Sequence, residues 1–395
     1  MINEFLKRPD VANFICKYAN EDVKKLALQG SPDADWPYPL ILDQIKSRQK
    51  AEKKIPDWTK IEGLIFPPPD IIEQASSLST ATYKASLMKG KTVCDLTGGA
   101  GVDSYAFTKS FKEVLTIERD QKLAEIINNN STLITNTKWS VICDSAESFI
   151  PKMAPADLVY IDPARRNSKQ KGLYKLEDCS PDITALLPLL KDKTRTVMLK
   201  ASPMLDLSAA ISTLPSLSAI HVVEWDGQCR EILCLMDFNN PTSAADIPIT
   251  AITINDAGLA IKQLSFTKTE EEREEASFGP PMNYIYEPGP AFQKSGAFNV
   301  IAHQYGLRKL HKHTHLYTGD KLLSDFPGRA FRFSGVLPAN AKALSFRKAN
   351  LSVRNFPAKA PALLKKLKLT EGGEDYLFAC TLSDGKKALL HCRKP

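Results

Sequence analysis

The sequence predicts an α/β protein whose central part is a mostly parallel β-sheet, and three observations lead to this expectation. Short apolar runs alternate with amphipathic segments from about residue 91 to residue 238, a pattern typical of parallel strands covered by helices on both faces. The first run ends in a glycine-rich turn. The last two runs are separated only by Gly227-Gln228-Cys229, which is too short for a crossover helix and predicts an antiparallel hairpin.

Seven runs are predicted to be strands: KTVCDL, EVLTIE, WSVICD, ADLVYID, TRTVMLKA, AIHVVEWD and REILCLMDF. With the last pair antiparallel, they form a seven-stranded, Rossmann-like sheet that differs from the all-parallel dinucleotide-binding sheet. We assign this domain to residues 91–239.

The residues on either side predict smaller regions. Residues 1–90 predict an N-terminal helical region, because apolar positions recur at helical spacing. Residues 240–335 predict an α+β domain with a hairpin, an exposed acidic loop at 270–275, a helix opened by Pro290 and an alternating strand, LRKLHKHTHLYT. Residues 336–395 predict a strand, a helix and a hairpin, which would form a second α+β domain.

Composition limits the classes of protein that are possible. The chain has 395 residues, of which 43% are hydrophobic and 25% charged, as in ordinary globular proteins of two or three domains. It lacks an apolar run of membrane-spanning length and a signal peptide, so we expect a cytoplasmic protein that does not bind membranes. Eight cysteines without a Cys-x-x-Cys pair predict reduced, mostly buried thiols.

Positive charge is concentrated in the last quarter of the chain. The net charge is +7, but residues 291–395 carry 19 Lys and Arg against 6 Asp and Glu, a net charge of +13. A concentrated positive field attracts polyanions, although a solvated basic surface without a partner gives the same composition.

The glycine-rich turn after the first strand predicts a cofactor site. It reads Asp95-Leu96-Thr97-Gly98-Gly99-Ala100-Gly101-Val102-Asp103, where glycines let the backbone approach a ligand. The dinucleotide fingerprint G-x-G-x-x-G fails because Ser104 stands at its third glycine position. Asp95, at the strand end, can instead face the cationic amino acid half of S-adenosylmethionine (SAM). We take Asp95, Thr97, Gly99, Gly101 and Asp103 as candidate cofactor ligands.

Acidic residues end the next two strands. Glu118 lies about twenty residues after the turn, where a carboxylate can accept both hydroxyls of a ribose. Asp144 ends the third strand and can accept the exocyclic amine of adenine, although a surface acid that begins a helix is an equal alternative for this residue.

The fourth strand ends in Asp162-Pro163-Ala164-Arg165, which predicts a site for the methyl acceptor. In amino-directed methyltransferases, an acidic or amide side chain and a following proline carbonyl hold the acceptor amine. The acceptor then needs orientation toward the methyl group more than strong base catalysis. Arg165 can stack on a base or hold a phosphate. The fifth strand ends in Lys200-Ala201-Ser202-Pro203 without a cysteine, which disfavours covalent attack on a pyrimidine.

Three histidines, His311, His313 and His315, alternate and would share one face of a strand. No carboxylate or cysteine accompanies them in sequence, so we expect no metal site. A basic strand that faces RNA or solvent is the simpler interpretation.

The chain resembles the RNA-directed branch of class I SAM-dependent methyltransferases. It is most similar to a bacterial family with a ferredoxin-like domain and a C-terminal THUMP-like domain. The matching stretches cover most of the chain: EQASS from Glu73, DLTGGAGVDS, DPARR, YIYEPGPAFQKSGAF, THLYTGD and RNFPAKAPALLKKLKLTEGGEDYLF. The resemblance implies that residues 240–335 are ferredoxin-like, that residues 336–395 are THUMP-like, and that the substrate is tRNA or rRNA.

Together these features predict a SAM-dependent methyltransferase that N-methylates a base in tRNA or rRNA, with Asp162, Pro163 and Arg165 as candidate catalytic residues. Two alternatives stay open. One is an RNA-binding or assembly protein with an inactive methyltransferase fold. The other is a methyltransferase that acts on a small molecule or a protein.

Overall fold

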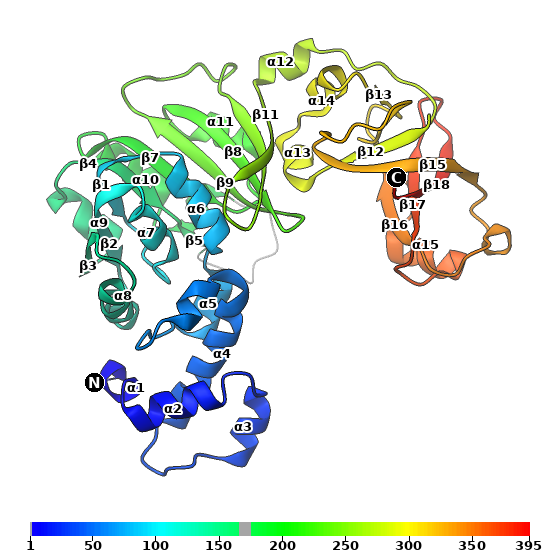
Figure 1. Cartoon of the computed structure of the whole chain (residues 1–395). Helices are drawn as coiled ribbons and strands as arrows, with labels where there is room; N and C mark the ends of the chain where they lie inside the picture. Colours follow the sequence, from blue (N-terminus) through cyan, green and yellow to red (C-terminus); the bar gives the residue numbers. More distant parts are fainter. Residues whose placement is uncertain (1, 166–174) are drawn as a thin grey trace. The chain divides into compact units, whose positions relative to one another are not determined.

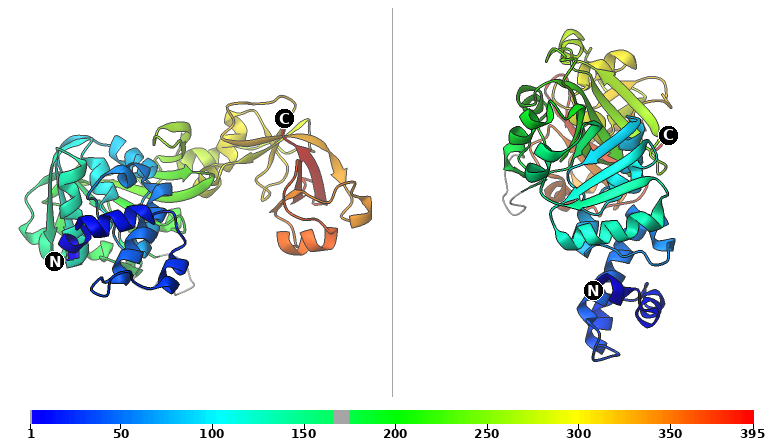
Figure 2. Two further views of the ribbon diagram at one scale, coloured as in Figure 1. Left: turned by 60° about the horizontal axis from the view of Figure 1, so that its bottom comes forward. Right: turned by 90° about the vertical axis from the view of Figure 1, so that its left-hand side faces the viewer.

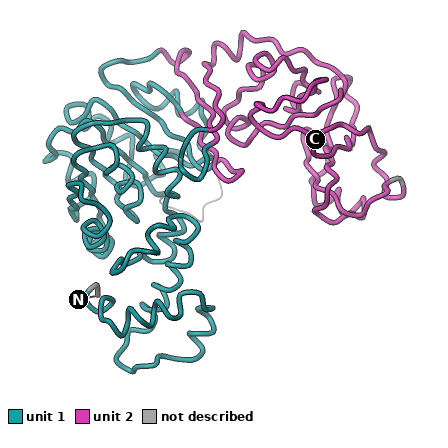
Figure 3. The backbone as a smooth tube through the Cα atoms, in the orientation of Figure 1, with its two compact units in different colours: residues 1–220, 230–242, 254–260 teal, residues 221–229, 243–253, 261–395 magenta. Residues whose placement is uncertain are grey.

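The computed structural model describes residues 2–165 and 175–395, which divide into two compact units. Unit 1 comprises residues 1–220, 230–242 and 254–260, and unit 2 comprises residues 221–229, 243–253 and 261–395. Figure 3 colours unit 1 teal and unit 2 magenta.

Unit 1 begins with helices, as the sequence predicts. They are α1 (Ile2–Leu6), α2 (Pro9–Lys17), α3 (Val23–Gln29), α4 (Tyr38–Lys54), the 3-10 helix η1 (Pro56–Lys60), α5 (Pro69–Gln74) and α6 (Leu78–Ser86). Val11, Ile41 and Ile45 are fully buried and share a hydrophobic cluster with Ile126 of α8 (Gln121–Ile134). The N-terminal helices therefore pack against α8, as Figures 1 and 2 show.

All seven predicted strands are present in the sheet. They are β1 (Gly90–Asp95), β2 (Phe111–Glu118), β3 (Lys138–Cys143), β4 (Ala156–Ile161), β7 (Thr194–Ala201), β8 (Leu217–Trp225) and β9 (Gln228–Asp237). The pairs β1–β2, β2–β3, β1–β4 and β4–β7 are parallel, and β9 is antiparallel to β7. The α/β fold class is confirmed.

The predicted number of strands was wrong. The sheet has nine strands in the order β11-β10-β8-β9-β7-β4-β1-β2-β3, because β10 (Ile249–Ile254) and β11 (Ala260–Phe266) extend it. A hairpin that pairs with an edge strand satisfies backbone groups that would otherwise stay unpaired.

The helices after the strands of unit 1 are α7 (Val102–Phe107), α8, α9 (Ala146–Phe149), η2 (Ile150–Lys152), α10 (Ile183–Leu190) and α11 (Leu207–Thr213). Three of them begin after an aspartate whose carboxylate accepts a backbone N–H of the first turn. These capping residues are Asp120, Asp182 and Asp206. Such caps fix where a helix starts, and hence where the preceding strand must end. The short strands β5 (Ala164–Arg165) and β6 (Cys179–Ser180) pair with each other, and η3 (Leu176–Asp178) precedes β6.

Unit 2 contains a second sheet of seven strands in the order β13-β14-β12-β15-β18-β17-β16. Its elements are α12 (Lys268–Arg273), β12 (Tyr284–Pro288), α13 (Pro290–Ser295), α14 (Phe298–Gln304), β13 (Arg308–Lys309), β14 (Tyr317–Gly319), β15 (Gly328–Leu337), η4 (Ala341–Ala343), β16 (Asn350–Arg354), α15 (Ala360–Leu367), β17 (Asp375–Thr381) and β18 (Lys387–Arg393). The long strand β15 pairs with β12 on one side and with β18 on the other. The expected domain boundary between residues 335 and 336 lies inside this strand.

Two local predictions in unit 2 were wrong. The acidic segment forms α12 rather than a loop, because Thr267 and Glu270 make a reciprocal capping box. Residues 311–315 form a turn between β13 and β14 rather than an alternating strand, so the three histidines do not share a strand face. His315 has a φ of 52° and stacks on Phe298. Among the described residues, no group of three His, Cys, Asp or Glu side chains is placed to hold a metal ion.

Most cysteine side chains lie in the two cores. Cys94, Cys179, Cys234, Cys380 and Cys392 are buried, Cys229 is half-buried, and Cys16 and Cys143 are exposed. Within the described ranges, each helix is too short or too polar to cross a lipid bilayer.

Candidate functional site

The glycine-rich turn joins β1 to α7 and depends on its glycines. Gly99 and Gly101 have φ values of +54° and +79°, a region that side chains rarely adopt. A Cβ atom on Gly98 would lie 2.7 Å from a methyl carbon of Thr116 on the neighbouring strand β2. The turn therefore keeps its backbone close to the sheet, with no side chain over residues 98 and 99.

The Asp95 carboxylate fixes the conformation of this turn through two hydrogen bonds. One of its oxygens accepts the backbone N–H of Thr97 at 2.9 Å, and the other accepts the hydroxyl of Ser104 at 2.5 Å. The residue is 1% exposed, and burial raises the pKa of Asp95 to about 7. Asp95 therefore fixes the conformation of the turn from within the protein interior.

Glu118 ties the end of β2 to the same turn. Its Oε2 accepts the backbone N–H of Gly99 at 2.7 Å, and its Oε1 accepts that of Asp120 at 2.9 Å. Glu118 is 8% exposed, yet its carboxylate contributes to the wall of a cavity. Asp144 follows β3, and its Oδ1 accepts the backbone N–H of Ser145 at 2.8 Å.

One cavity of about 350 Å³ brings these strand ends together. Six of the residues predicted from the sequence line it: Thr97, Gly99, Asp103, Glu118, Asp144 and Asp162. Four do not: Asp95 and Gly101, which shape the turn, and Pro163 and Arg165. Pro163 is buried, and Arg165 is half-buried in the small β5–β6 sheet. The cavity lies at the carboxyl ends of parallel strands, where ligands bind in open α/β sheets.

Asp162 is the acidic residue at the end of β4. Its backbone N–H donates to Thr97 Oγ1 at 2.7 Å, which links it to the glycine-rich turn. Its Oδ2 lies 2.5 Å from the ammonium nitrogen of Lys200, at the end of β7. Burial alone would lower the pKa of Lys200, but the carboxylates of Asp162, Asp103 and Glu231 outweigh it and raise that pKa above its ordinary value.

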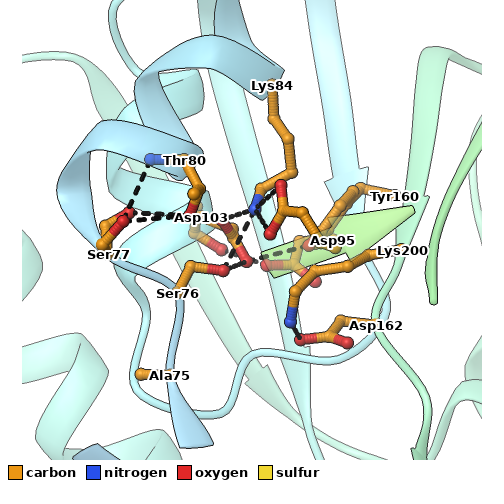
Figure 4. Close-up of polar contacts among 12 residues, drawn as sticks. Ala75, Ser76, Ser77, Thr80, Lys84, Asp95, Asp103, Tyr160, Asp162 and Lys200 are labelled. Atoms are coloured by element: carbon orange, nitrogen blue, oxygen red, sulfur yellow. Dashed lines mark hydrogen bonds and ion pairs between the residues drawn. The ribbon is translucent and has the colours of Figure 1, made fainter. Parts of the chain in front are cut away.

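A buried ionic cluster next to the cavity was not predicted from the sequence (Figure 4). The Lys84 ammonium on α6 is 0% exposed and lies 2.8 Å from both carboxylate oxygens of Glu231 on β9. It also lies 3.1 Å from Asp103 Oδ1 and donates to Ser76 Oγ at 3.1 Å. The contact with Asp103 Oδ1 brings opposite charges together without hydrogen-bond geometry, so that oxygen lacks a donor among the described residues.

The other oxygen of Asp103, Oδ2, accepts the hydroxyls of Ser76 and Tyr160, each at 2.8 Å. Burial favours the neutral acid, but Lys84, Lys200 and these hydroxyls hold the pKa of Asp103 below its ordinary value. Burial raises the pKa of Glu231 despite its contact with Lys84. The cluster thus keeps three carboxylates and two ammonium groups within one small region.

A comparison with solved structures identifies the family of this chain. A candidate methyltransferase from Porphyromonas gingivalis W83 shares 31% sequence identity over 99% of this chain and 98% of its own, with a TM-score of 0.87. The chain belongs to this methyltransferase family. Family models match the C-terminal part of the chain as a ferredoxin-like domain at residues 284–327 and a THUMP domain-like region at residues 328–394.

Two further structures match only part of the chain. M. capricolum TrmK in complex with S-adenosyl-homocysteine is 15% identical over 42% of this chain and 69% of its own, with a TM-score of 0.31. A candidate RNA methyltransferase from Pyrococcus horikoshii is 18% identical over 39% of this chain and 74% of its own, with a TM-score of 0.26. Structural similarity at these TM-scores does not indicate a substrate for this chain. A comparison with curated proteins gives no significant match.

Proposed function

We propose that this family member is a SAM-dependent methyltransferase that methylates a nitrogen of a base in tRNA or rRNA. The observation that carries the proposal is one cavity whose lining includes Gly99, Glu118, Asp144 and Asp162. It combines a site for a cofactor with a ribose and a site for an acceptor group.

The residues of the cavity fit SAM. Glu118 is the residue that would accept the ribose hydroxyls, and Asp144 would accept the amine of adenine. The turn at Thr97 and Gly99 would approach the amino acid half, supported by Asp95 and Gly101 from outside the cavity. Asp103 also lines the cavity and would lie near the same half. When bound, SAM supplies an electrophilic methyl group on a sulfonium ion.

Asp162 is the residue we propose to hold the acceptor. It lines the cavity, and its backbone is fixed by Thr97. Pro163, the next residue, is buried and restricts the backbone conformation of Asp162. Arg165, two residues further on, would contact a phosphate of the substrate.

Glu118→Ala is expected to weaken SAM binding about 10- to 100-fold, because the variant loses hydrogen bonds to a charged group worth about 1.5 to 3 kcal/mol. Isothermal titration calorimetry measures the change. The matched control is Glu113→Ala at the other end of the same strand, where the side chain pairs only with the exposed Lys138. Equal SAM affinity in the Glu118 variant and in the unmodified chain would remove the cofactor assignment.

RNA as the substrate is supported by the basic composition of residues 291–395. Lys365 and Lys366 are exposed on α15, within the THUMP-like region. The paired change Lys365→Glu and Lys366→Glu is expected to weaken RNA binding and to flatten its salt dependence. Each phosphate contact contributes a slope of about −0.7 on single strands and about −0.9 on duplexes in a log–log plot, so the slope falls by about one to two.

Fluorescence anisotropy with tRNA and rRNA fragments over a series of salt concentrations measures this slope. Lys24→Glu with Lys25→Glu is the matched control, because it reverses two consecutive exposed lysines on helix α3 of unit 1. Equal slopes for the α15 variant and the unmodified chain would show that α15 does not contact RNA.

A further inference from the structure

We propose that the methyl acceptor is a group that carries a hydrogen and gives it up during transfer, and that Lys200 positions Asp162 to take this proton. The inference rests on the proposed function and narrows its acceptor to one chemical class. Lys200 is a positioning residue, because it acts through Asp162 rather than by contact with the acceptor.

The geometry leaves one oxygen of Asp162 available to a ligand. Lys200 holds Oδ2 at 2.5 Å, whereas Oδ1 has no hydrogen-bond partner among the described residues. The Asp162 side chain is 32% exposed and lines the cavity, while the Lys200 side chain is only 14% exposed behind it. Figure 4 shows the Lys200 ammonium against one oxygen of Asp162, and we infer that the other oxygen meets the acceptor.

The surrounding charges keep this arrangement intact. Lys84 is occupied by Glu231 and Asp103, so Lys200 is the ammonium group that remains for Asp162. The titratable and charged groups around the pair come from several elements: Lys54 of α4, Lys84 of α6, Asp95 of β1, Asp103 of α7, Tyr160 of β4, and Arg230 and Glu231 of β9. The Lys200 ammonium thus contacts the carboxylate that would accept the proton.

Methyl transfer to such an acceptor adds a methyl group to the acceptor and removes a proton from it. A bond forms between the acceptor atom and the methyl carbon, the carbon–sulfur bond breaks, and its electron pair stays on sulfur. The acceptor hydrogen leaves as a proton to Asp162 Oδ1, which becomes a neutral acid and later releases the proton to water. The sulfonium charge and the carboxylate charge disappear together, and the methylated product is neutral.

A ring nitrogen without a hydrogen fits this site poorly. Its methylation gives a cationic product beside the Lys200 ammonium and leaves Asp162 with no proton to accept. Two sources supply an acceptor with a hydrogen: an amine or ring N–H of a base, and a ribose hydroxyl. Both lose a proton and give neutral products.

The test is mass spectrometry of tRNA and rRNA nucleosides from cells with and without the gene, combined with transfer by the purified full chain. Loss of a neutral nucleoside methylated on a base nitrogen supports both the inference and the proposed function. A methyl group on a ribose oxygen supports the inference and overturns the nitrogen acceptor of the proposed function. A cationic nucleoside, methylated on a ring nitrogen that bears no hydrogen, overturns the inference alone. If no RNA nucleoside changes, both the proposed RNA substrate and the proposed class of acceptor are wrong.

Variants of Lys200 test the ion pair separately. Lys200→Met is expected to keep SAM affinity and to lower the rate of transfer, because the Asp162 carboxylate loses the ammonium that holds its Oδ2. Lys200→Arg, which keeps a cation at this place, is expected to restore part of the rate. Without cofactor, Lys200→Met should lower the denaturation midpoint less in an Asp162→Asn background than in the unmodified chain. A normal rate in Lys200→Met together with additive midpoints would show that Lys200 does not act through Asp162.

Discussion

Asp162→Ala is expected to lower methyl transfer by about 10²- to 10⁴-fold, the range that a positioned acid or base contributes, while SAM affinity stays within about twofold. The reason is that the proposed function assigns Asp162 to the acceptor and assigns Glu118 and Asp144 to the cofactor, and all three residues line the cavity. Asp162→Asn separates two roles of this residue. It keeps an oxygen that can orient an amine but cannot take a proton, so it should lose nearly as much rate as Asp162→Ala.

Transfer of labelled methyl groups to RNA, alongside calorimetry with SAM, measures both quantities. Asp192→Asn is a suitable control. Asp192 is exposed in the turn before β7, whereas Lys200 lies near the opposite end of that strand. A normal rate in Asp162→Ala would refute the assigned acceptor site. A normal rate in Asp162→Asn alone would reduce the role of Asp162 to orientation.

Lys84→Met is expected to destabilise unit 1 by about 3 to 5 kcal/mol, the cost of removing one partner from a buried ion pair. The methionine fills a similar volume, so the loss comes from Glu231 and Asp103, which remain buried without their ammonium partner. The destabilisation should become smaller as the pH falls. Burial already raises the pKa of Glu231, so this carboxyl can take up a proton instead of staying charged.

Urea denaturation monitored by circular dichroism at several pH values measures the loss. Lys109→Met serves as the matched control, because Lys109 is exposed at the surface beside Tyr105. Adding Glu231→Gln to Lys84→Met should recover part of the stability by removing one unpaired charge. A loss below about 1 kcal/mol, typical of a surface ion pair, would show that Lys84 does not compensate the two carboxylates.

Much of the sheet could be predicted because its signals are local. Each strand from β1 to β9 in the first sheet contains a short apolar run, and the turn at 227–229 allows no crossover. The glycines at 99 and 101 marked positions with positive φ, which few other residues tolerate. The acidic strand ends at Glu118 and Asp144 followed from the rule that ligands bind at the carboxyl ends of parallel strands.

The residues behind the cavity could not be predicted because their partners are distant in sequence. Lys84 and Glu231 are separated by 147 positions, and only the packing of α6 near β9 brings them together. One signal was present: Lys200 directly follows the apolar run Val197–Leu199, and Glu231 directly precedes the apolar run Ile232–Met236. A charged residue there is costly when buried unless it is paired. The capping box of α12 was also visible as Thr267 and Glu270, but the acidic composition suggested a loop.

The sheet of unit 2 limits how this family can change during evolution. Family models place a domain boundary between residues 327 and 328, at the first residue of β15. Strand β15 supplies backbone partners to β12 from the ferredoxin-like side and to β18 from the THUMP-like side. The two modules are joined by backbone pairing of β12 with β15, so exchange of one module between genes would require a matching strand register in the other. The two modules are therefore expected to be inherited, gained and lost as a single unit.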